Sequence, residues 1–176
     1  MTLSNFTIVD LKATTRKKFV DNRGSFERLY DSTWIKNLDS LPQQMNVSRN
    51  TNKGTLRGMH FQLTGEPEHK LVSLLSGSIY LAVVDLRKDS RSYLEVNSFE
   101  LSSQDLTAIF IPSGCATGWI SLESNTDIHY VMYSRFEDNT YGGLRYNDPF
   151  FKIPWPAAPS VISEQDMRWP LFNSRH

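Results

Sequence analysis

The stretch RGMHFQ, residues 57–62, places an arginine and a histidine three positions apart among apolar residues, in a chain with only four histidines. An imidazole can take or return a proton near neutral pH, and a guanidinium makes bidentate contacts with phosphate oxygens. In an extended strand, side chains three apart face opposite sides, so Arg57 and His60 meet only if the strand bends at Gly58. The alternative interpretation is a strand with a hydrogen-bonded core histidine and a surface arginine.

The elements that must position these groups are short strands. Residues 70–90, KLVSLLSGSIYLAVVDLRKDS, form two apolar runs hinged at 76–78, which predicts a buried hairpin. Four later segments are also short, rich in β-branched or aromatic residues and bounded by turn residues: YLEVNSFELS, TAIFIPSG, WISLE and DIHYVMYSRF. Strands at such regular spacing, without helical segments between them, predict an all-β antiparallel sandwich or barrel.

Two segments flank these strands. Residues 32–41, STWIKNLDSL, predict one short helix with Asp31 or Ser32 as its cap. The C-terminal tail carries too many prolines to lie inside a central sheet. It is therefore expected to wrap the outside of the sheets, tied down by Trp155 and Trp169.

Length and composition favour a single domain spanning residues 1–176 and exclude several function classes. The 19 basic and 19 acidic residues balance and are spread along the chain, so neither nucleic acid nor an acidic membrane surface is an expected partner. The single cysteine, Cys115, excludes an internal disulfide and suggests a reducing compartment. No targeting segment or membrane-length apolar run is evident, so we expect a soluble cytoplasmic protein.

A metal centre is one chemistry that a histidine in a β-barrel could serve. Metal-binding cupins supply His-x-His and a later Glu from one strand and Pro-x-Gly-x-x-His from another. Here Gln62 follows His60 at the second histidine position, and PSGCAT, residues 112–117, ends in Thr117 where the third would stand. Because an amide or a hydroxyl is a poor substitute for imidazole, the sequence predicts no metal site and a cavity for an organic ligand. A metal-dependent cupin oxygenase is the least favoured function.

Many ordered stretches between residues 21 and 166 resemble one family, the dTDP-4-dehydrorhamnose 3,5-epimerases, which act on nucleotide-linked 4-keto-6-deoxy sugars. The matching stretches are DNRGSF, QMNVS, LRGMHFQ, KLV, VDLRKDS, IPSGCATGW, HYVMY, GGLRYNDP, IPWP and ISEQD. The resemblance implies a cupin-like antiparallel jelly-roll barrel with short flanking helices and without metal or cofactor. It also implies a homodimer with N-terminal strands exchanged or packed across the interface.

The resemblance further implies roles for individual residues. His60 falls on the family's general base, Asp166 on its paired carboxylate, Lys70 on the lysine near the substrate ketone, and Tyr130 on the general acid. The residues expected to bind the substrate are Arg23 and Arg57 at the diphosphate, Gln44 and Asn46 lining the nucleotide site, Phe136 against the base, and also Phe26 and Arg28.

These side chains suit epimerisation next to a ketone. Carbons 3 and 5 of a 4-ketohexose flank the carbonyl, so loss of either proton gives an enolate whose charge rests on the ketone oxygen. His60 could take the proton, Lys70 could stabilise the oxyanion, and Tyr130 could return a proton on the opposite face. Each also has an ordinary structural interpretation: Tyr130 as core, Lys70 as a solvated edge residue, Asp166 as an anchor of the tail.

Two departures from the family pattern bear on specificity. Thr117 and Leu81 stand where the family commonly has a second histidine and its supporting aspartate. Their presence predicts that inversion is restricted to one of carbons 3 and 5. Arg28 stands where a glutamate near the nucleotide is usual, with Glu27 beside it, so CDP, UDP or GDP could replace dTDP.

The leading hypothesis is therefore a metal-independent epimerase that inverts carbon 3, carbon 5 or both in a nucleotide-linked 4-keto-6-deoxyhexose. Such a reaction belongs to deoxysugar biosynthesis, for example for lipopolysaccharide. Two alternatives stay open: a 3,4-ketoisomerase on the same substrate class, and a sugar-nucleotide binding protein that has lost catalysis.

Overall fold

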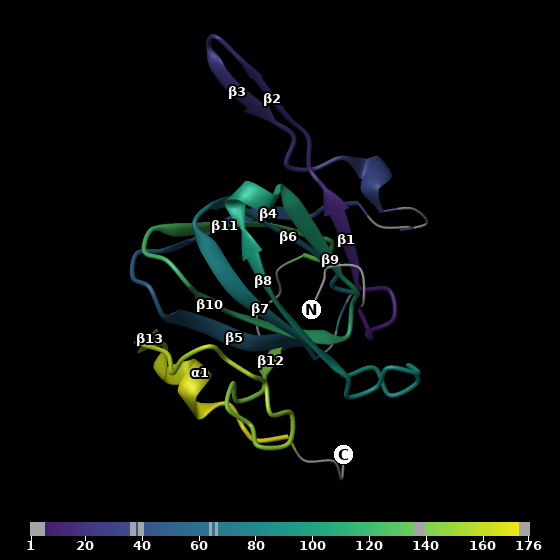
Figure 1. Ribbon diagram of the computed structural model, residues 1–176. Coiled ribbons are helices and arrows are strands. Elements are labelled where there is room, and N and C mark those ends of the chain that lie inside the picture. Colours follow the sequence, from purple (N-terminus) through teal and green to yellow (C-terminus); the bar gives the residue numbers. More distant parts are fainter. Residues whose placement is uncertain are drawn as a thin grey trace.

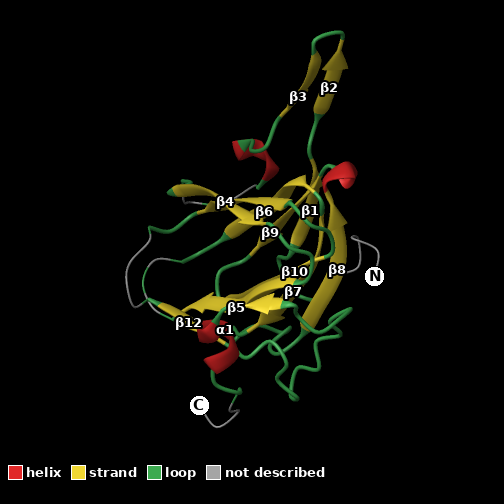
Figure 2. Ribbon diagram, turned by 90° about the vertical axis from the view of Figure 1, so that its left-hand side faces the viewer, coloured by secondary structure: helices red, strands yellow, loops and turns green. Residues whose placement is uncertain are grey.

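The computed structural model describes residues 6–35, 38, 41–63, 65, 67–135 and 140–172. Two antiparallel sheets form separate layers, with a smaller hairpin projecting beyond them (Figures 1 and 2). The all-β antiparallel prediction is thus confirmed. No described helix is long and apolar enough to cross a bilayer.

The first layer is a five-stranded sheet. Its order is β1 (Lys12–Thr15), β9 (Thr107–Ile111), β6 (Lys70–Ser76), β11 (Thr126–Met132) and β4 (Gln44–Asn50). Its outer face holds a buried cluster that includes Phe110 and Val131, covered by Tyr30 and Trp34. This cover follows from the sequence of β9, TAIFI, which is apolar on both faces and so needs burial on both.

The second layer is a six-stranded sheet. Its order is β12 (Tyr141–Gly143), β5 (Thr55–Gln62), β10 (Cys115–Ser121), β7 (Ser78–Asp85) and β8 (Val96–Ser102), with β13 (Val161–Ile162) parallel to β5. The C-terminal tail covers its outer face, where Trp155 and Phe172 pack on buried Met59 and Val84. The prediction that the tail wraps the outside is confirmed.

The main core lies between the two layers. Its members are aliphatic side chains at alternate positions of both sheets, including Val72, Leu74, Leu81, Val83 and Ile128. Alternation along each strand sends one set of side chains inward and leaves the other for the outer clusters. The inward set, where it turns polar toward one end of the core, supplies the site described below.

The predicted hairpin over residues 70–90 is wrong. β6 belongs to the five-stranded sheet and β7 to the six-stranded sheet, so the chain crosses between layers at Gly77. Gly77 has φ +73°, and a Cβ there would lie 2.3 Å from the Thr126 hydroxyl. Two apolar runs separated by a glycine are expected both for a hairpin within one sheet and for a crossing between two sheets, because the same side chains are buried in both arrangements.

In the described part of the chain, three short helices flank the sheets: η1 (Ser32–Trp34), η2 (Ser103–Asp105) and α1 (Glu164–Arg168). The helix expected over 32–41 forms only as η1, and several residues after it lie outside the described part of the chain. Asp31 is its cap, as predicted, and accepts a hydrogen bond from the Thr33 N–H. α1 begins at a Ser163 cap, which accepts a hydrogen bond from the backbone N–H of Asp166.

Candidate active site

His60 and Asp166 form a hydrogen-bonded pair although 106 residues separate them, with the carboxylate buried and the imidazole partly exposed. The Asp166 Oδ1 atom lies 2.7 Å from His60 Nε2 and also accepts a hydrogen bond from Trp169 Nε1, while Oδ2 accepts one from the Gly58 N–H. A carboxylate only accepts, so Nε2 carries the proton and Nδ1 is left with a lone pair. Burial opposes the charge of Asp166, but the bonds from His60, Gly58 and Trp169 outweigh it and lower the pKa of the carboxyl.

The strand that carries His60, β5, bends at Gly58, the position at which the sequence analysis required a bend. In the pairing of β5 with β10, His60 faces Thr117 and Arg57 faces Trp119, so β5 holds one more residue than its partner between these pairs. This bulge restores Arg57 and His60 to one side of the strand. Gly58 makes it possible with φ +115°, at a position where a Cβ would lie 2.6 Å from the Gly118 Cα atom.

A cavity of about 470 Å³ opens at His60 between the two sheets. The five-stranded sheet contributes two rows of paired residues: Val72, Tyr130 and Asn46 in one, Lys70, Met132 and Gln44 in the next. The six-stranded sheet contributes His60, Thr117, Trp119 and Tyr141, and the C-terminal segment adds Gln165 and Trp169. Five of the predicted residues, His60, Lys70, Tyr130, Gln44 and Asn46, therefore line one cavity, with Asp166 directly behind the imidazole.

Tyr130 and His60 belong to opposite sheets. Trp119 and Tyr130 approach across the cavity with ring centroids 6.1 Å apart. Burial raises the pKa of the Tyr130 phenol, and the positive charge of Arg57 lowers it in part. The phenol thus keeps its proton at neutral pH and can act as a proton donor from the wall that faces the imidazole.

Lys70 has a partner that the sequence analysis missed. Its Nζ lies 2.9 Å from Glu68 Oε1, with 12% of the lysine side chain and 2% of the glutamate side chain exposed. Tyr141 donates a hydrogen bond to the other glutamate oxygen. The polar loop TGEPEH gave no pattern to single out Glu68; its spacing of two from Lys70, which puts both on one side, was the only available signal.

Arg57 lies at the edge of the same site. Its Nε donates to Asn50 Oδ1 at 3.1 Å, and it lines a neighbouring hollow of about 400 Å³ that shares His60 and Gln165 with the main cavity. A guanidinium held by its Nε still has both terminal nitrogens for an anion. The position suits the predicted contact with a diphosphate.

Three predicted binding residues do not reach the cavity of their own chain. Arg23, Phe26 and Arg28 lie on or next to the projecting hairpin of β2 (Lys18–Asp21) and β3 (Gly24–Glu27) (Figure 1). The Arg23 side chain is 85% exposed and pairs with Asp21 at 2.6 Å, and Arg28 pairs with Asp31 at 2.7 Å. The fourth, Phe136, lies outside the described residues.

The two departures from the family pattern differ in their surroundings. Leu81 is fully buried in the core between the sheets. Thr117 lines the cavity at 3% exposure, and its hydroxyl has no hydrogen-bond partner among the described residues. No group of three or more histidine, cysteine, aspartate or glutamate side chains suited to a metal ion occurs in the described part of the chain.

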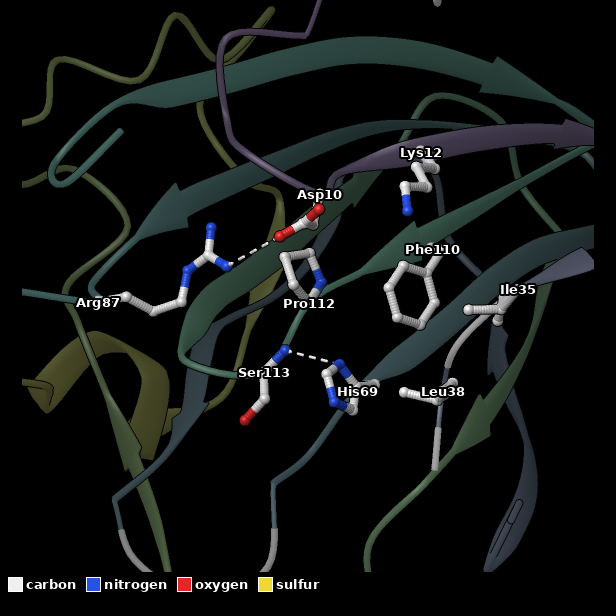
Figure 3. A pocket seen from close by; sticks show the side chains of 9 residues that line it. All are labelled: Asp10, Lys12, Ile35, Leu38, His69, Arg87, Phe110, Pro112 and Ser113. Atoms are coloured by element: carbon white, nitrogen blue, oxygen red, sulfur yellow. Dashed lines mark hydrogen bonds and ion pairs between the residues drawn. The ribbon is translucent and has the colours of Figure 1, made fainter. Parts of the chain in front are cut away.

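A second cavity, of about 330 Å³, lies on the outer face of the five-stranded sheet and contains none of the predicted site residues (Figure 3). His69 lines it, stacked on Phe110 with centroids 5.4 Å apart, and its Nδ1 accepts a hydrogen bond from the Ser113 N–H. Burial, followed by the charge of Arg87, lowers the pKa of His69. Lys70, the next residue along the chain, lines the other cavity instead.

The sequence and the fold match known proteins along nearly the whole chain. Residues 5–174 match the sequence model of the dTDP-4-dehydrorhamnose 3,5-epimerases. The protein of that name from Sinorhizobium fredii is 32% identical over 173 residues, which cover 97% of this chain and 89% of that one. The chain belongs to the dTDP-4-dehydrorhamnose 3,5-epimerase family.

Two solved structures of the dTDP-4-dehydrorhamnose 3,5-epimerase family show the same fold. The Bacillus anthracis protein, with TDP and PPi bound, matches with a TM-score of 0.89 at 30% identity over 97% of this chain and 98% of that one. A Legionella pneumophila dTDP-6-deoxy-D-glucose-3,5-epimerase, in complex with dTDP-4-keto-L-rhamnose, matches with a TM-score of 0.87 at 29% identity over 95% and 90%. The predicted family, the cupin-like fold and the epimerase class are thereby confirmed.

Proposed function

We propose that this protein inverts carbons adjacent to the ketone of a dTDP-linked 4-keto-6-deoxyhexose, in deoxysugar biosynthesis. The observation that carries the proposal is the His60–Asp166 pair facing Tyr130 across one cavity between two sheets. Inversion needs a base on one face of the sugar ring and an acid on the other, and this arrangement supplies both. The names of the relatives support dTDP as the nucleotide.

Each step of the reaction has a side chain in place. His60 Nδ1 takes the proton from the carbon next to the ketone, and Asp166 stabilises the imidazolium that results. The Lys70 ammonium donates to the oxygen on which the enolate charge collects. Tyr130 then gives its proton to the opposite face of that carbon, which inverts the centre.

The test is incubation in heavy water with dTDP-4-keto-6-deoxyglucose, followed by NMR of the product. We expect deuterium at the inverted carbons, none with His60→Ala, and normal incorporation with Glu164→Gln, a change in an exposed residue of α1. Deuterium at carbon 3 alone, or at carbon 5 alone, would support the restriction to one centre that Thr117 and Leu81 predict. Deuterium at both carbons would contradict it. A carbonyl moved to carbon 3 would support the ketoisomerase instead, and tight binding without exchange would support the inactive binding protein.

We further propose that the protein works as a homodimer whose projecting hairpins complete each other's sites. The hairpin extends away from both sheets (Figure 2) and exposes apolar side chains, with Phe19 58%, Val20 75% and Phe26 63% exposed. Arg23, Phe26 and Arg28 would then meet the nucleotide in the partner's cavity. Monomers do not usually leave such side chains uncovered on an extended arm.

Mixing two inactive variants tests the exchange of hairpins. His60→Ala keeps its hairpin and Arg23→Ala keeps its base, so a mixed dimer regains one complete site if hairpins act in trans. We expect activity to return on mixing, and sedimentation to show dimers. No recovery despite mixed dimers would place the hairpin with its own chain. A cytoplasmic location stays a prediction.

A further inference from the structure

The lysine assigned to the ketone oxygen sits in a buried network that the proposed reaction does not use. Glu68 Oε1 pairs with Lys70 Nζ at 2.9 Å, and Oε2 accepts hydrogen bonds from Tyr141 and, at 3.4 Å, from the Ser134 hydroxyl. The carboxylate is thus surrounded by donors and is almost completely removed from water. Burying a carboxylate is costly unless it is paired, so a buried Glu68 indicates a function for this residue.

Glu68 joins both sheets at the end of the cavity. Lys70 is the first residue of β6 in the five-stranded sheet, whereas Tyr141 is the first residue of β12 in the six-stranded sheet. His69, between Glu68 and Lys70, lines the cavity on the outer face instead (Figure 3). The carboxylate therefore fixes the lysine relative to the sheet that carries His60.

Resting on the proposed function, we infer that Glu68 is a positioning residue that holds the Lys70 ammonium, charged and oriented, where the enolate oxygen forms. A lysine side chain is a flexible four-carbon stem with three N–H donors. One donor bound to Glu68 fixes the nitrogen and leaves the others for the substrate. Preorganised charge of this kind stabilises a developing oxyanion without reorganisation during the reaction.

The same network distinguishes the two phenols of the cavity. Tyr141 donates its hydroxyl to Glu68, and burial followed by this bond raises its pKa. No hydrogen bond joins the Tyr130 hydroxyl to another described residue. Tyr141 thus supports the carboxylate, and Tyr130 is the phenol that returns the proton.

Removing the charge of Glu68 leaves Lys70 without its buried counter-ion. The ionisable groups near the lysine are Glu68, the phenols Tyr130 and Tyr141, His60 across the cavity, and the Cys115 thiol. Of these, Glu68 is the group whose carboxylate lies against the ammonium, at 2.9 Å. With glutamine in its place, the buried ammonium loses both its ionic partner and its fixed position.

The experiment compares Glu68→Gln with Lys70→Ala and with the double variant, using Glu100→Gln on the exposed side of β8 as a matched control. We expect Glu68→Gln to lower kcat by about 10- to 100-fold, less than the loss of a direct oxyanion donor, with KM changed less than threefold. In the Lys70→Ala background, Glu68→Gln has little further effect, because Glu68 acts through the lysine.

Equal losses in both backgrounds, or a loss carried by KM and not by kcat, would overturn the inference. NMR of the Lys70 ammonium gives a readout independent of turnover: its N–H protons exchange faster with water in Glu68→Gln, which lacks the ionic partner, and are unchanged in Glu100→Gln. A parent protein that turns over no substrate would refute the proposed function alone, and the exchange measurement would still decide the role of Glu68. Circular dichroism confirms that each variant is folded.

Discussion

Replacing Asp166 by asparagine keeps the shape of the side chain and removes one hydrogen-bond acceptor from a place that needs two. Oδ1 receives His60 Nε2–H and Trp169 Nε1–H, and Oδ2 receives the Gly58 N–H. If the amide oxygen takes the Oδ1 position, the NH₂ group points at the Gly58 N–H. Two buried donors then face each other without an acceptor, which lowers the free energy of unfolding by about 1–3 kcal/mol. If the amide turns over, its NH₂ donates to Nε2, and the proton of the imidazole moves to Nδ1.

The first outcome keeps the lone pair at Nδ1 but removes the negative charge that stabilises the imidazolium, and the second removes the proposed base, because that tautomer has no lone pair at Nδ1. We expect Asp166→Asn to lower kcat by roughly 10²- to 10⁴-fold, the usual contribution of general acid–base catalysis, with KM nearly unchanged. Steady-state kinetics and deuterium incorporation measure the loss, and ¹⁵N NMR of the imidazole reports the tautomer. Glu164→Gln, on the same helix but exposed, is the control. A variant within threefold of the parent rate would show that the carboxylate does not set the tautomer.

Three further variants probe the framework of the site. Gly58→Ala should destabilise the fold by about 2 kcal/mol or more, through a positive φ and a clash with β10, whereas Gly24→Ala has φ +130° and no neighbour within 4 Å. Thr117→Val should raise the free energy of unfolding by about 1 kcal/mol, because it removes a buried hydroxyl without a described partner. Burial, followed by the positive charge of Arg16, lowers the pKa of His129 in the folded protein, so the unfolded chain binds more protons. The free energy of unfolding therefore falls as the pH drops below about 6.5, and His129→Gln should flatten this dependence.

Denaturant unfolding checks all three, the last between pH 5 and 8. Equal losses for Gly58→Ala and Gly24→Ala would mean that backbone strain alone, and not contact with β10, governs the bulge. A destabilised Thr117→Val would reveal a partner for the hydroxyl. An unchanged pH dependence in His129→Gln would assign the effect to other groups, among them His69, whose pKa is also lowered.

Strand content could be predicted from sequence, whereas strand partners could not. β6 and β7 were correctly found as apolar runs, yet they pair with β11 and β8 in different layers. Inward-facing side chains look alike in both arrangements, and only long-range packing selects between them. The bend at Gly58 could be predicted conditionally. Side chains alternate along a regular strand, so Arg57 and His60 lie on the same side only if the strand bends between them.

The site could be predicted only in part for the same reason. No periodicity links His60 to Asp166, and the family resemblance alone paired them. Glu68 was missed because its partners come from three separate segments, and a polar loop residue gives no sign of burial. Arg23 and Phe26 lie on an arm that projects away from the cavity of their own chain, so their proposed role follows from neither sequence periodicity nor the fold of a single copy.

The layered architecture explains why these residues can serve an inversion at all. Stacked sheets pack about 10 Å apart, with side chains filling the space between them, and a ring can enter only where those side chains leave a cavity, here of about 470 Å³. The proposed base, His60, is held on one sheet by a bulge and a C-terminal helix, and the proposed acid, Tyr130, on the other by the regular pairing of β11 with β4. Their separation is set by the core between the layers, and Glu68 links the two sheets through Lys70 and Tyr141. Changes in core volume next to Val72 or Val83 should therefore alter the reaction without touching a reacting group.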